Sequence, residues 1–302
     1  MTPAELLEIY YHSKLRKWNA TTLRDSKRNL SRFLEFLKAA GVTRAMAITA
    51  LHLQNYRAHL DASKLSQNSI YDYLSVVCTW LRWAFLAGHL LEDPGREFKI
   101  KRSKAHTRFI PTQTQVQALL NIPSQRNRLD QRIRTAFELL YGTGLRRAEL
   151  LKLNLQDIEH DPPGVWVRRG KGGKDRLQPL GDKLFGILTS YLEDTRALFS
   201  PGPGENALFL GLRGNRWSEI AFAKTFAFYA GRAGMPRLSP HGLRNAFATH
   251  LLENGAELHQ VQFLLGHEDI RTTERYTQLH PLELQKIHRR FHPRAHRKTA
   301  RG

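Results

Sequence analysis

The sequence predicts a mainly α protein of two domains, the second of which contains one small antiparallel β-sheet. The chain of 302 residues is about twice the ~150 residues of a typical domain. Hydrophobic residues make up 41% of it, which is enough for packed cores. A basic stretch without apolar periodicity, residues 96–108, interrupts the helical patterns. We therefore expect a helical domain over 1–103, a basic linker over 104–111 and a second domain over 112–302.

The charge of the chain indicates a polyanionic partner. Lys and Arg number 47 and Asp and Glu 27, a net charge of +20. Residues 1–103 hold 16 basic and 9 acidic side chains (+7), and the remainder holds 31 and 18 (+13). Two basic domains are typical of a protein that binds one extended polyanion with both domains. No apolar run reaches the ~20 residues of a membrane helix, and the first residues lack the pattern of a signal peptide, so we expect a cytoplasmic protein.

The first hundred residues predict four helices. Thr21 or Thr22 is placed to cap a helix with apolar residues at helical spacing, which Gly41 ends. A second strong pattern covers 69–87 and ends at Gly88, and weaker patterns cover 4–17 and 49–61.

The second domain begins with a capping box. Thr112 and Gln115 open a helix, a longer helix over 129–141 ends in the 142–144 segment Gly-Thr-Gly, and a short helix follows over 146–153. Strands at 165–167 and 176–178 flank a glycine-rich turn and predict a hairpin. The rest is helical.

No metal or nucleotide site is expected. The single cysteine, Cys78, lies in an apolar run typical of a buried thiol, and no Cys/His cluster has the spacing of a zinc site. The turn Gly170-Lys171-Gly172 lacks the Ser or Thr of a phosphate-binding loop and lies in a hairpin, so an ATP site is not expected. We predict no cofactor and no metal.

One helix start is suited to a phosphate. Ser239 caps it and Pro240 occupies its first position, so His241 and Arg244 share one face of the first turn, where the helix dipole favours an anion. Alone, the pair is equally typical of an exposed helix. The same is true of Arg146 at a helix start.

Taken together, six positions resemble the tyrosine recombinases, the integrase family of site-specific DNA recombinases, and most nearly their short bacterial Xer-like branch. The likeness covers 110–285, while 1–103 matches only in architecture, as a SAM-like core-binding domain. The motifs read TGLRRAEL, GKGGKDR, HGLR and LGH, followed nine residues later by a tyrosine. The catalytic residues that the resemblance implies are Arg146, Lys171, His241, Arg244, His267 and Tyr276.

The resemblance also implies their roles. Tyr276 is the nucleophile that forms a 3′-phosphotyrosyl bond, and Arg146 and Arg244 hold the phosphate oxygens in place of a metal ion. Lys171 protonates the leaving 5′-oxygen, although Lys174 lies on the same turn. His241 assists proton transfer and His267 binds a phosphate oxygen.

Glu149 matches an acidic position of the family and lies one turn after Arg146, where it is placed to orient Arg146 or His241; a solvated ion pair is the equal alternative. Two positions depart from the family pattern, Gly242 after the histidine and Asn245 after the second arginine.

The implied function is site-specific DNA recombination through a Holliday junction, without ATP or metal. The partners are double-stranded DNA with paired inverted half-sites and a homotetramer, or a heterotetramer with a paralogue, and no membrane. The segment 281–302, with apolar residues Leu282, Leu284, Ile287 and Phe291, is expected to be exchanged between protomers, or else to fold back on its own domain.

Two alternatives stand beside this function, a type IB topoisomerase-like enzyme that relaxes DNA and a non-catalytic DNA-binding protein on the same fold. The sequence does not define the target site, the accessory partners, the order of strand exchange or the biological role among chromosome dimer resolution, plasmid or transposon resolution and integration.

Overall fold

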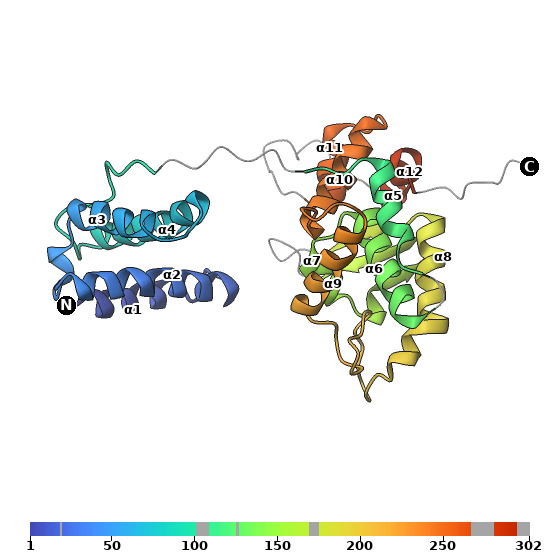
Figure 1. Ribbon diagram of the computed structural model, residues 1–302, viewed down its shortest axis with the longest axis horizontal. Coiled ribbons are helices and arrows are strands. Elements are labelled where there is room, and N and C mark those ends of the chain that lie inside the picture. The colour runs from blue at the N-terminus through green and yellow to red at the C-terminus, as the bar shows by residue number, and fades with distance from the viewer. Residues whose placement is uncertain (19, 101–108, 125–126, 169–174, 267–280, 295–302) are drawn as a thin grey trace, which may run out of the picture. The chain divides into compact units, whose positions relative to one another are not determined.

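The computed structural model describes residues 1–302 except 19, 101–108, 125–126, 169–174, 267–280 and 295–302 (Figure 1). The chain divides into two compact units, Met1–His106 and Thr107–Gly302. Each unit has its own hydrophobic core. Among the described helices, none is both long and apolar enough to cross a lipid bilayer.

The first unit is helical, as predicted. Its α1 begins with a capping box, in which the Thr2 hydroxyl accepts from the Glu5 N–H at 3.2 Å and the Glu5 carboxylate accepts from the Thr2 N–H at 2.9 Å. The prediction that Thr21 or Thr22 caps a helix was wrong, because that helix begins at Ala20. The elements are α1 (Pro3–Lys14), α2 (Ala20–Ala39), the 3₁₀ turn η1 (Ala45–Ala47), α3 (Ala50–Asp61) and α4 (Gln67–Leu86).

Aromatic side chains from three helices meet in the core of this unit. The ring of Phe33 on α2 lies 4.8 Å from that of Tyr56 on α3 and 6.3 Å from that of Trp80 on α4, and all three are buried. Such contacts stabilise the helix pairs beyond the area that they bury. Burial, together with the nearby Asp93, raises the pKa of the Cys78 thiol to about 11, so this thiol stays protonated at neutral pH.

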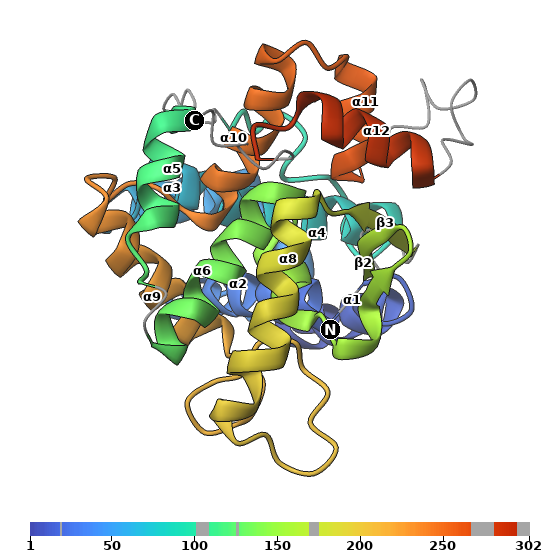
Figure 2. The ribbon, with the colours of Figure 1, turned by 90° about the vertical axis from the view of Figure 1, so that its right-hand side faces the viewer.

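The second unit is built around α6. Figure 2 shows α8 running beside α6, and α5 and α10 also pack on α6. The C-terminal part of α6 is buried on every side, which is typical of a helix at the centre of a domain. The helices are α5 (Gln113–Asn121), α6 (Arg128–Thr143), α7 (Arg147–Lys152), α8 (Asp182–Ser190), α9 (Glu219–Arg232), α10 (Pro240–Glu253), α11 (Leu258–Leu265) and α12 (Pro281–Phe291); short turns are η2 (Leu155–Asp157), η4 (Tyr191–Thr195) and η5 (Arg196–Phe199).

The sheet confirms the predicted hairpin and adds a strand. The order is β1 (Ile158–His160), β2 (Pro163–Val167), β3 (Arg176–Pro179), and both pairs are antiparallel. The first strand has only three residues, too few for an alternating pattern to predict it. Val167 pairs with Arg176, so β3 starts next to the segment that connects the two strands of the hairpin.

The last helix packs on its own unit. Leu284 is buried in the main core, Ile287 and Phe291 pack against that core, and α12 lies beside α11 (Figure 2). Beyond α12, the Arg294 guanidinium is buried in an ion pair with Glu138 of α6. In the single chain, the described part of 281–302 therefore folds back on its own unit, which was the alternative to exchange between protomers.

Candidate active site

A tight turn after α6 positions Arg146 at the start of α7. Gly144 ends α6 in the left-handed conformation, with φ of 63°, and its N–H donates to the Leu140 carbonyl. A side chain is disfavoured in that conformation, and a Cβ on Gly144 would lie 2.5 Å from Cδ1 of Phe247. Two residues later Arg146 is the N-cap of α7. The segment Gly-Thr-Gly thus ends α6 and sets the backbone position of Arg146.

Glu149 holds Arg146 by both its backbone and its side chain. One carboxylate oxygen accepts from the Arg146 backbone N–H at 2.8 Å and the other from its guanidinium at 2.8 Å. The Glu149 side chain is only 11% exposed, whereas that of Arg146 is 33% exposed. The carboxylate therefore lies inside the unit, in contact with both the backbone and the guanidinium of Arg146, and its role in orienting Arg146 stays a prediction.

Arg244 comes from α10, which starts as predicted. The Ser239 hydroxyl accepts from the Gly242 N–H at 3.1 Å, and Pro240 occupies the first turn. The Arg244 side chain is 4% exposed, and its guanidinium donates to the carbonyls of Gly144 and, at 2.7 Å, Leu265. Burial, helped by the charge of Arg146, lowers the pKa of Arg244 to about 10, so it remains a cation at neutral pH.

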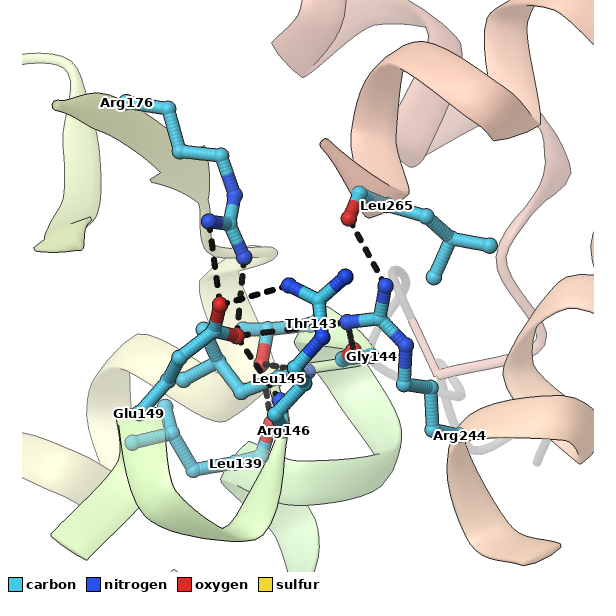
Figure 3. Close-up of polar contacts among 9 residues, drawn as sticks. All are labelled: Leu139, Thr143, Gly144, Leu145, Arg146, Glu149, Arg176, Arg244 and Leu265. Carbon is cyan, nitrogen blue, oxygen red and sulfur yellow. Dashed lines mark hydrogen bonds and ion pairs between the residues drawn. The ribbon is translucent and has the colours of Figure 1, made fainter. Parts of the chain in front are cut away.

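The structure adds Arg176, which the sequence did not indicate. Its two terminal nitrogens donate to the two carboxylate oxygens of Glu149 at 3.2 and 2.9 Å. The sequence predicts this residue only as the first position of a strand; the one available signal is that it ends the motif GKGGKDR, two residues after Lys174. Figure 3 shows the guanidinium groups of Arg146, Arg176 and Arg244 gathered about Glu149.

The charges of this cluster favour an anion. Three guanidinium groups surround one carboxylate, and the Arg244 guanidinium lies 3.9 Å from Glu149. Burial tends to raise the pKa of Glu149, but the hydrogen bonds from Arg176 and Arg146 outweigh it, and the pKa lies below its ordinary value. The carboxylate is therefore charged at neutral pH, and the cluster keeps a net charge of +2. Guanidinium groups match the paired oxygens of a phosphate.

Of the four other predicted catalytic residues, the structure describes only His241. His241 is exposed in the first turn of α10, three residues before Arg244. Lys171, His267 and Tyr276 lie outside the described residues. Two described residues that are near Lys171 and His267 in the sequence lie at the cluster. Arg176, five residues after Lys171, begins β3, and Gly266, directly before His267, ends α11 against Arg176, where a Cβ would lie 2.9 Å from the Arg176 Nε.

Two family models match the chain. Residues 111–283 match the Phage integrase family, and residues 5–100 match the Phage integrase SAM-like domain. Tyrosine recombinase XerD of Staphylococcus epidermidis (strain ATCC 35984) is 33% identical over 270 residues, which cover 89% of this chain and 91% of that protein. Tyrosine recombinase XerD of Staphylococcus aureus (strain N315) is 32% identical over 278 residues, or 92% and 94%.

Solved structures share the fold. The Tn1549 transposon integrase in complex with circular intermediate DNA superposes with a TM-score of 0.71 at 18% identity, covering 95% of this chain and 98% of that one. A lambda integrase dimer bound to a COC′ core site gives 0.70 at 20% identity, covering 92% and 96%. With the family models and the XerD relatives, the conclusion is that this chain belongs to the phage integrase family and is a tyrosine recombinase.

Proposed function

We propose that the protein is a site-specific DNA recombinase that cleaves and rejoins strands through a 3′-phosphotyrosyl intermediate. The observation that carries this proposal is the pair Arg146 and Arg244, brought from two different helices to one carboxylate, Glu149. A scissile phosphate beside both guanidinium groups would have its non-bridging oxygens stabilised as negative charge develops on them. Loss of one such donor costs about 10²–10³-fold in rate in other enzymes.

The proposed step exchanges one phosphate ester for another. The phenol oxygen of Tyr276 attacks phosphorus and gives up its proton with the help of His241. The bond from phosphorus to the 5′-oxygen breaks, and that oxygen takes a proton from Lys171, leaving a free 5′-hydroxyl. The phosphotyrosine retains the energy of the broken ester, so the reverse attack by a 5′-hydroxyl rejoins a strand without ATP.

The rest of the chain would hold the DNA. We assign the first unit as a core-binding domain that grips the duplex together with the second unit, with the basic segment 104–111 between them. The basic balance of both parts supports this assignment. Recombination through a Holliday junction requires four cleavages and hence four protomers on paired half-sites. The segment 281–302, whose described part packs on its own unit in the single chain, would be exchanged between protomers in that assembly.

The test starts by letting the wild-type protein select a duplex from a random-sequence library. That duplex, nicked so that cleavage releases a short strand and traps the intermediate, should give a covalent protein–DNA adduct on a denaturing gel. Tyr276→Phe should abolish the adduct, whereas Tyr73→Phe in the first unit should retain it. An adduct that persists in Tyr276→Phe refutes the nucleophile assignment.

The same reagents separate the two alternatives. Binding of the selected duplex without any adduct from the wild-type protein supports a DNA-binding protein that is not catalytic. Relaxation of a supercoiled plasmid that lacks the selected sequence supports a topoisomerase-like enzyme. Joining of two selected duplexes into exchanged products, observed as strands of new length, supports the recombinase.

A further inference from the structure

Arg176 connects three parts of the proposed active site. It is the first residue of β3 and lies five residues after Lys171 in the sequence. Its guanidinium binds both oxygens of Glu149, at 3.2 and 2.9 Å, and the same carboxylate holds Arg146. It also packs on Gly266, whose φ of 64° and lack of a side chain allow the close approach. Gly266 is followed directly by His267.

We propose that Arg176 is a positioning residue, which sets the phosphate-binding arginines through Glu149; the inference rests on the proposed recombinase chemistry. Arg176 contacts Glu149 from β3, whereas Arg146 and Arg244 approach the carboxylate from α7 and α10, and the paired hydrogen bonds of Arg176 fix the plane of the carboxylate. A bidentate arginine–carboxylate pair is the geometry that best defines such an orientation.

The bonding of Glu149 explains what Arg176 contributes. One oxygen accepts from the guanidinium groups of Arg146 and Arg176, and the other accepts from the Arg146 backbone N–H and from Arg176, 3.9 Å from Arg244. The carboxylate is thus already satisfied on the side of β3. Without Arg176 the charge of the carboxylate would be offset by Arg146 and Arg244 alone, and it would attract these two guanidinium groups more strongly.

The location of Arg176 also argues against a role that only stabilises the fold. Three cations within one cluster repel one another: burial is the main cause of the lowered pKa of Arg244, and the charges of Arg146 and Arg176 lower it further. A neutral hydrogen-bond donor would avoid that repulsion. A third guanidinium is therefore suited to a site that receives a phosphate, whose charge then offsets the excess.

The test compares two arginines of the same hairpin. Arg176→Gln removes the proposed positioning contact. Arg168→Gln removes an equal charge just after β2, where Arg168 pairs with Asp175 at 3.0 Å and Asp157 at 3.3 Å and is 49% exposed. Each variant is mixed in excess with the nicked duplex selected by the wild type. Single-turnover cleavage, the dissociation constant for that duplex and the melting temperature are measured.

We expect Arg176→Gln to cleave about 10²-fold more slowly while its dissociation constant changes less than about threefold, because orientation matters most in the transition state. Arg176→Lys should not rescue cleavage, since an ammonium cannot form the paired contact. Arg168→Gln should cleave like the wild type. In a double-mutant cycle, Glu149→Gln and Arg176→Gln should be strongly non-additive.

A substrate with sulfur at the bridging 5′ position separates Arg176 from the leaving-group acid. A thiolate leaves without protonation, so this substrate should restore cleavage by Lys171→Ala but not by Arg176→Gln. Restoration of Arg176→Gln overturns the assignment to the phosphate-binding arginines. The assignment is also overturned if Arg176→Gln cleaves as fast as the wild type. The same holds if its cleavage rate and its affinity for the duplex fall by the same factor and its melting temperature falls as well. If the wild type gives no adduct at all, the proposed function itself fails.

Discussion

Two stacked histidines should make the stability of the second unit fall in mild acid. His288 and His292 lie one turn apart at the end of α12, with ring centroids 4.7 Å apart and planes within 10°. Both are buried, and the His288 Nε2–H donates to the Gly142 carbonyl at 2.6 Å. Burial disfavours the charged ring and lowers the pKa of His288 to about 4, and the pKa of His292 lies well below its ordinary value.

The direction and size of the effect follow from proton binding. Between pH 6.5, the ordinary value for histidine, and about pH 4, the unfolded chain binds a proton at His288 that the folded chain does not. The free energy of unfolding therefore holds its full value above pH 6.5 and falls as the pH drops toward 4. For His288 alone, the loss at pH 5 is about 2 kcal/mol.

The measurement is chemical denaturation of the full-length protein at pH 7.5 and pH 5. His288→Gln keeps a donor near Gly142 but does not titrate, so its loss of stability between the two pH values should be about 2 kcal/mol smaller than that of the wild type. His12→Gln, on an exposed position of α1, is the matched control and should leave the loss unchanged. An equal loss in His288→Gln and the wild type would refute the reasoning.

Three other predictions concern the turn, the C-terminal ion pair and the DNA. Gly144→Ala should destabilise the protein by more than Gly41→Ala. A side chain at positive φ costs about 1 kcal/mol at either position, but of these two positions only at Gly144 would the Cβ also clash with a neighbour, Phe247. Equal losses of denaturation midpoint in the two variants would contradict this difference in packing. Arg294→Met should cost about 3–5 kcal/mol because it leaves Glu138 buried and unpaired, and adding Glu138→Met should restore much of that loss. Affinity for the selected duplex, measured by fluorescence anisotropy, should fall steeply between about 50 and 200 mM salt. A dissociation constant that does not change with salt would argue against binding through the DNA phosphates.

Local signals predicted the helix ends that hold the site. The capping box at Thr112, the Ser239 cap followed by Pro240 and the glycine that ends α6 depend on neighbours within four residues. Such contacts form within one turn, so the sequence alone defines them. The misplaced cap at Thr21 or Thr22 shows the limit of this reasoning, because several adjacent positions suited a cap and the helix began at Ala20.

The sequence by itself determined the class of fold, the family and the order of its motifs, because these are written in spacing and residue type. Only the tertiary structure decided which arginines share Glu149: Arg146 and the carboxylate are three residues apart, but Arg176 is 27 residues from it. It also decided that α12 packs on its own unit. Both outcomes depend on how strands and helices that are distant in the chain pack together, and no local propensity encodes that arrangement.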